Sequence, residues 1–211
     1  MQQIRVFYNK VGRLKFVSHL DLNRFFIRVL RKSGLNCYYS EGFNKRLHIN
    51  FALPLSLGFE SENDAVDFKE LDDLPLETVA QKIKAVMPQG LEFVGVSNPV
   101  HKTGEIAFAK YSLFFENAQI AKELEDFLSK DSIEIEKTGK KGKITALDLK
   151  PHIHNPQITQ NQNGTLFELF LPAGTPLNIN PSLLLSAFDG GKNYCNVTRK
   201  GLCLSDFSPF C

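Results

Sequence analysis

The order in which strand-like and helix-like stretches follow one another limits the possible folds of this chain more than any other feature. Strands are indicated by alternating apolar and polar side chains, and helices by apolar side chains three or four residues apart. In the first 100 residues these patterns are, in turn, a strand, a helix, two strands, a helix and a strand, at 4–10, 18–34, 48–55, 63–71, 76–87 and 91–100. This β-α-β-β-α-β order is that of a ferredoxin-like α+β unit.

A connection rich in turn-forming residues, NPVHKTGE, is followed by a second series of similar order with one strand added. Its two short middle strands, SIEIEKT and KITALDL, flank a KTGKKGK turn at 137–143. The sequence therefore predicts two tandem ferredoxin-like (βαββαβ) units, a basic one over 1–100 and a second over 106–211. No residue-level repeat is visible, so the predicted duplication rests on the pattern alone.

The composition is that of a folded protein rather than a disordered or fibrous one, with 43% hydrophobic and 23% charged residues. No apolar run approaches the roughly 20 residues that span a bilayer, and the N-terminal stretch lacks the apolar core of a secretory signal. The four cysteines include no C-x-x-C pair, which predicts reduced thiols. We therefore expect a cytoplasmic protein without a membrane partner.

Charge is distributed unevenly along the chain. Residues 1–50 contain ten Lys and Arg against two acids, a net charge of +8, whereas residues 51–100 contain three against nine, a net charge of −6. A concentrated basic segment on a chain of net charge +2 is typical of a protein that binds a polyanion or an acidic partner surface. The alternative is that the acidic segment, 60–77 above all, packs over the basic one and cancels it.

The predicted first helix carries three arginines on one face. Arg24, Arg28 and Arg31 stand at i, i+4 and i+7, opposite the apolar stripe of the helix. Ser18 is a suitable N-cap, with Asp21 three residues later. Such a face suits a phosphate backbone, and a merely solvated helix face is the alternative. The basic residues that precede the helix and would extend the same surface are Lys10, Arg13 and Lys15.

The loop within YSEGFNKRLHINF combines an aromatic ring with an amide and two cations. Gly42 permits a tight backbone, Phe43 follows it, and Asn44, Lys45 and Arg46 come next. This combination suits stacking on a nucleic-acid base together with phosphate contact. The alternative is that the Phe43 ring packs onto the sheet and anchors the loop.

Motifs of catalysis are missing from the sequence: it has no P-loop, no dinucleotide-binding glycine pattern, no H-E-x-x-H and no G-x-S-x-G. An independent enzyme would use His19 with Asp21 or Glu41 as acid and base. Asp21 lies only two residues from His19, so on a helix the two side chains point to different faces. We therefore expect no catalytic residue.

A metal site has weak support in the sequence. His152 and His154 form an H-x-H pair that, on one face of a strand, can bind zinc if thiolates approach from elsewhere. The candidate thiolates are the cysteines near the C-terminus, at 195, 203 and 211. Nothing in the spacing requires a metal, and we expect neither a metal nor a cofactor.

Three motifs together resemble the opening of the radical SAM-linked (DUF2344) family. They are F-[LV]-S-H-L-D-L at 16–22, Y-S-E-G-F-N at 39–44 and P-L-x-[LV]-G at 54–58, and the resemblance is specific across 4–58. The family pattern continues after Y-S-E-G-F-N with Pro and a basic or His residue, whereas this chain has Lys45 and Arg46. The further motif residues are Ser18, His19, Asp21, Tyr39, Ser40, Glu41, Gly42 and Asn44.

The resemblance implies a radical S-adenosylmethionine (radical SAM) enzyme as partner. Combined with the basic N-terminal segment, it leads us to expect a non-catalytic accessory protein for that enzyme, which binds or presents RNA. The residues expected to contact RNA are Arg13, Lys15, Arg24, Arg28, Arg31, Phe43, Lys45 and Arg46. Two alternatives remain: a protein–protein docking module that uses the same surface without RNA, and an independent enzyme.

Overall fold

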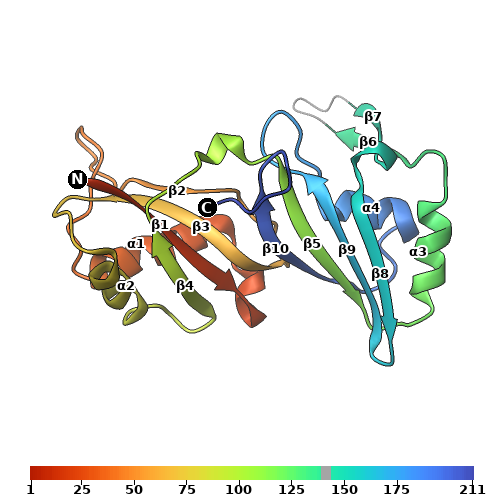
Figure 1. The fold of residues 1–211 in the computed structure, drawn as a ribbon, viewed down its shortest axis with the longest axis horizontal. Helices are drawn as coiled ribbons and strands as arrows, with labels where there is room; N and C mark the ends of the chain where they lie inside the picture. The colour runs from red at the N-terminus through yellow and green to blue at the C-terminus, as the bar shows by residue number, and fades with distance from the viewer. Residues whose placement is uncertain (139–143) are drawn as a thin grey trace. The chain divides into compact units, whose positions relative to one another are not determined.

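The computed structural model describes residues 1–138 and 144–211, which form two compact units (Figure 1). Unit 1 comprises Met1–Glu105 with Pro209–Cys211, and unit 2 comprises Ile106–Ser208. Both units combine strands with helices, as expected for the α+β class. Residues 209–211, expected with the second unit, lie in unit 1 because Arg5 holds them: its Nη1 donates a hydrogen bond to the Cys211 carbonyl oxygen at 2.6 Å.

Unit 1 contains four strands and two α-helices in the predicted order. These are β1 (Gln2–Lys10), α1 (His19–Lys32), β2 (Ile49–Phe51), β3 (Glu60–Glu70), α2 (Leu76–Lys84) and β4 (Leu91–Ser97). Within this unit the strands lie in the order β4-β1-β3-β2, and each neighbouring pair is antiparallel. Both helices cover one face of the sheet, where the core includes Ile4, Val6, Phe26, Phe68 and Ile83.

The ends of α1 follow from the sequence. Ser18 caps the helix, with its Oγ accepting a hydrogen bond from the Asp21 backbone N–H at 3.2 Å. Gly34 follows the last turn with φ +66°, a conformation that glycine adopts without a steric penalty. Between β1 and α1, residues Gly12–Phe16 form the 3₁₀ helix η1, because Gly12 turns the chain with φ +61°.

Unit 2 repeats this strand arrangement with an inserted hairpin. Its elements are β5 (Phe108–Phe115), α3 (Ile120–Leu128), β6 (Glu134–Thr138), β7 (Ile144–Asp148), β8 (His154–Asn161), β9 (Gly164–Pro172), α4 (Pro181–Asp189) and β10 (Asn196–Cys203). Strands β10-β5-β9-β8 lie side by side, all antiparallel, while β6 and β7 form a separate two-stranded sheet within the described residues. Of the predicted turn at 137–143, residues 139–143 lie outside the described residues.

Helices α3 and α4 pack on one face of the unit 2 sheet. The Phe188 ring of α4 lies 5.3 Å from that of Phe127 on α3 and 6.2 Å from that of Phe115 on β5, measured between ring centroids. Strand β8 is the element that sequence analysis missed. It is an edge strand of mostly exposed polar side chains, so it lacks the apolar alternation that reveals a half-buried strand. No helix in the described part of the chain is long and apolar enough to cross a membrane.

Candidate nucleic-acid interface

The first turn of α1 holds a closed set of polar contacts. The Ser18 hydroxyl donates a hydrogen bond to Asp21 Oδ2 at 2.8 Å, and Arg24 Nη1 donates to Asp21 Oδ1, also at 2.8 Å. These hydrogen bonds hold the pKa of Asp21 below its ordinary value, and the bond from Ser18 has the largest effect. The Asp21 carboxylate is therefore a structural partner of the cap and of Arg24.

The His19 side chain packs against an aromatic ring. Its ring meets the Phe51 ring edge-on, with 4.9 Å between the centroids. Burial, and to a smaller extent the charge of Lys10, lowers the pKa of His19, so its neutral form is favoured. In the described residues no hydrogen bond joins His19 to Asp21 or Glu41, the partners that an acid–base pair would need.

The three arginines of α1 stand on its solvent side. Arg24, Arg28 and Arg31 are all exposed, as their helical spacing predicts. Arg24 forms an ion pair with Asp21, and both side chains are at least half exposed. Arg28 and Arg31 form no ion pair with any residue of 1–138 or 144–211. Two guanidinium groups are thus available to an external anion.

The acids of β3 do not cover this face, because three of them are interior. Asp64, Asp67 and Glu70 are 2%, 4% and 0% exposed. Asp67 is bound by Arg5 in a bidentate ion pair, with both N···O distances 2.8 Å. Glu70 accepts hydrogen bonds from the side chain of Gln2 and from backbone N–H groups just after β3. The alternative of a cancelled basic face therefore fails for these three carboxylates.

Two residues change the basic surface that sequence analysis described. Lys10, one of the ten cations of residues 1–50, is 2% exposed and thus belongs to the interior, like Arg5. Lys82 of α2 joins the surface near the end of α1, since its Nζ lies 4.0 Å from where a Cβ on Gly34 would be. Because segment 51–100 has a net negative charge, the sequence analysis did not assign this lysine to the basic surface. A cation at this position also interacts favourably with the negative, C-terminal end of the α1 helix dipole.

The loop Ser40–Arg46 is closed and presents an aromatic ring to solvent. The Ser40 backbone N–H donates to the Arg46 carbonyl oxygen at 2.8 Å, and the Arg46 N–H donates to Ser40 Oγ at 3.0 Å. Gly42, with φ +113°, makes the turn. Phe43 is fully exposed, so it does not anchor the loop on the sheet. The neighbouring Lys45 and Arg46 are exposed as well, whereas the motif residues Tyr39 and Ser40 are half-buried.

The predicted contact residues form three groups in chain order: η1, α1 and the loop Ser40–Arg46. Arg13 and Lys15 are in η1, before the helix begins, and the three arginines line the helix itself. Beyond its end, the Asn36 carbonyl accepts from Leu71 N–H at 2.8 Å, which ties the chain leading to the loop to the end of β3. With 14 residues, α1 is about 21 Å long. The groups therefore suit an extended chain better than a compact ligand.

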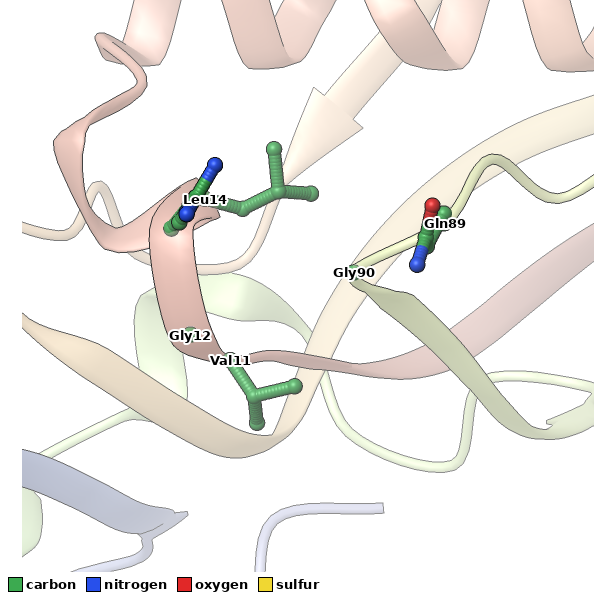
Figure 2. A pocket seen from close by; sticks show the side chains of 6 residues that line it. Val11, Gly12, Leu14, Gln89 and Gly90 are labelled. Carbon is green, nitrogen blue, oxygen red and sulfur yellow. The ribbon is translucent and has the colours of Figure 1, made fainter.

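Arg13 also lines a cavity of about 430 Å³ beside η1 (Figure 2). Figure 2 shows the Leu14 side chain directed from η1 towards the Gln89–Gly90 segment. Gly90 has φ +88°, and a Cβ on it would lie only 2.8 Å from Leu14 Cγ, so glycine is required for this close approach. The cavity walls are mainly backbone and apolar side chains, with Arg13 as their single charged group.

The residues considered for metal binding are not brought together. His152 belongs to a 3₁₀ helix, η4 (Lys150–His152), and only His154 is in β8, so the expected pair on one strand face is wrong. No three His, Cys, Asp or Glu side chains gather into a possible metal site within the described ranges. Burial raises the pKa of Cys37 to about 11 and that of Cys195 to about 12, which keeps both thiols protonated.

A comparison with protein-family models identifies the group to which the chain belongs. The model described as "Uncharacterized protein conserved in bacteria (DUF2344)" matches residues 3–181. This range includes β1, α1 and the loop with Phe43, and it extends to the first residue of α4. The search of curated proteins finds no match. The chain belongs to the DUF2344 family.

Proposed function

We propose that this protein is a non-catalytic accessory protein that binds RNA along α1 of unit 1 and presents it to a radical SAM enzyme. The observation that carries the proposal is the exposed pair Arg28 and Arg31, which form no ion pair within the described residues. The burial of Asp64, Asp67 and Glu70 supports it, because these three carboxylates are not on the protein surface. Phosphate contacts from such a face position a nucleic acid without reading its sequence.

The remaining parts of the proposal have separate support. Phe43 stacks on a base of the RNA that the helix arginines bind. Its ring is fully exposed, and the backbone hydrogen bond between Ser40 and Arg46 closes the loop that presents it. The radical SAM enzyme is proposed from the resemblance of the three N-terminal motifs to the family, and a cytoplasmic location follows from that partnership. Two tandem ferredoxin-like units form part of the same proposal, supported by the β4-β1-β3-β2 and β10-β5-β9-β8 orders.

A salt series of RNA binding tests the helix face. The variant Arg24→Ala/Arg28→Ala/Arg31→Ala is compared with the wild type on bulk cellular RNA. If the three side chains contact phosphates, the slope of log K against log salt should become shallower by about 2, since each contact to a single strand contributes about 0.7. Fluorescence anisotropy at several salt concentrations measures both slopes.

A matched control removes the same charge elsewhere. Lys122, Lys130 and Lys192 are exposed lysines of unit 2, and their triple alanine variant should keep the wild-type slope. Equal slopes for the two triple variants would show that binding depends on net charge alone. Negligible binding by the wild type at low salt would refute the RNA proposal.

Docking of a protein partner without RNA is the second candidate, and exposed apolar side chains favour it. Phe16, Leu20 and Leu57 are 66%, 70% and 63% exposed. A hydrogen bond from Gly58 N–H to the Lys15 carbonyl at 2.8 Å holds the Leu57 loop against η1. Aromatic and arginine side chains are the usual anchors of such interfaces.

The double variant Phe43→Ala/Arg28→Ala separates the two functions. If the surface serves only as a docking module, this variant should bind the enzyme partner at least about tenfold more weakly, because hot-spot truncations exceed 1.4 kcal/mol each. Its RNA affinity should then equal that of the wild type. Lost RNA binding with intact docking would rule out the docking module, and paired pull-down and anisotropy measurements distinguish these results.

A further inference from the structure

The open face of the unit 1 sheet, opposite α1 and α2, contains two adjoining hollows. Ile4 and Val6 of β1 point into the helix-covered core, so the intervening Arg5 points to the open face. One hollow has a volume of about 310 Å³ and is lined by Arg5 and by Lys102 of the segment after β4. The second, of about 320 Å³, shares Asp67 with the first. Together they have the size of a small-molecule site.

The floor of the first hollow is a fixed guanidinium group. Arg5 is 0% exposed, and its Nε and Nη2 each donate to Asp67 at 2.8 Å. Nη2 also donates to the His101 carbonyl oxygen at 3.0 Å, whereas the one acceptor of Nη1 among the described residues is the Cys211 carbonyl oxygen. Because Nη1 carries two N–H groups, one donor remains on a side chain that cannot move.

Two buried polar atoms beside Arg5 have no hydrogen-bond partner among the described residues. They are His101 Nδ1 and Ser97 Oγ. His101 lines the hollow, and Ser97 lies directly across from Arg5 on β4, on the same face of the sheet. Buried polar atoms in proteins are nearly always paired, with protein, water or ligand. Of the two residues, His101 lines the hollow together with Arg5, so the unpaired Nδ1 of His101 and the spare N–H of Arg5 indicate a place for a hydrogen-bonding ligand.

The charges around the hollows define the ligand. Among the described residues that line them, Arg5, Lys69 and Lys102 face one carboxylate, that of Asp67, an excess of two positive charges. Most available groups are hydrogen-bond donors, and a phosphate monoester offers acceptor oxygens and close to two negative charges. We propose that this face binds a small phosphate monoester, with the phosphate beside Arg5 and Lys102 and its organic part in the adjoining hollow. The site is separate from the α1 surface and does not depend on RNA binding.

Titration of the full chain with inorganic phosphate and with AMP tests the proposal. Isothermal titration calorimetry should show saturable binding of both, with AMP tighter because its nucleoside reaches the second hollow. Lys102→Ala should weaken phosphate binding about tenfold, the effect of one lost charge-assisted contact. In the described residues Lys102 forms hydrogen bonds through its backbone alone. Its N–H donates to Glu105 Oε1 at 2.7 Å and its carbonyl oxygen accepts from the Glu105 N–H at 2.9 Å, so this variant should fold normally.

Lys84→Ala is the matched control, since Lys84 is an exposed lysine of α2 on the helix side of unit 1. It should leave phosphate affinity unchanged. Phosphate should also shift the His101 imidazole signals in the NMR spectrum, assigned by His101→Gln. Absence of saturable binding, an equal loss in Lys84→Ala, or equally tight binding of acetate would each overturn the proposal.

Discussion

Replacing Arg5 with methionine is expected to lower the free energy of unfolding of unit 1 by about 3–5 kcal/mol. The substitution leaves the Asp67 carboxylate, 4% exposed, without the guanidinium that binds both of its oxygens. It also removes the donor to the Cys211 carbonyl and the cation 4.1 Å above the Phe210 ring, so residues 209–211 should detach from unit 1. Hydrogen–deuterium exchange of β1, β3 and the 209–211 segment locates the loss.

The double variant Arg5→Met/Asp67→Leu is the control for this prediction. Replacing both members of a buried ion pair with apolar side chains is often neutral or stabilising, because no charge is left buried alone. Chemical denaturation should therefore place the double variant close to the wild type and well above Arg5→Met. A double variant as unstable as the single one would show that packing of the arginine, rather than the unpaired carboxylate, controls the stability of unit 1.

The Arg5–Asp67 pair also shows where sequence reasoning about charge was incomplete. Counting charges along the chain identified a basic and an acidic segment, and the exposed arginines of α1 followed directly from their helical spacing. The burial of Arg5 and Asp67 did not, because it depends on the pairing of β1 with β3 across 62 residues. Local periodicity contains no information on such long-range partners.

The candidate interface was predictable to the same degree. The Ser18 cap and the glycine turn at Gly42 follow from short-range rules, and the structure has both. The interior position of Lys10 and the addition of Lys82 required the packing of α1 and α2 on one sheet. Strand β8 was not predicted for a related reason. Its side chains are polar because it lies at the edge of the sheet, so the sequence shows no strand pattern there.

Gly164→Ala is expected to destabilise unit 2 by about 4 kcal/mol, the combined effect of backbone strain and overpacking. Gly164 begins β9 with φ +146°, a conformation that side chains rarely adopt. A Cβ at this position would lie 2.0 Å from the Phe115 carbonyl oxygen at the end of β5, and neither backbone can yield without breaking the β5–β9 register. Thermal unfolding monitored by circular dichroism should show the loss as a lower Tm.

Gly201→Ala provides the comparison within the same unit. Gly201 lies in β10, where a Cβ would meet no atom within 4 Å, so its substitution should change the free energy of unfolding by less than about 1 kcal/mol. A similar small effect of Gly164→Ala would mean that the turn before β9 can shift, and with it the register that joins β9 to β5. A large effect at Gly164 alone makes the close approach of these two strands the reason for glycine there, a requirement that the NQNG turn sequence does not reveal.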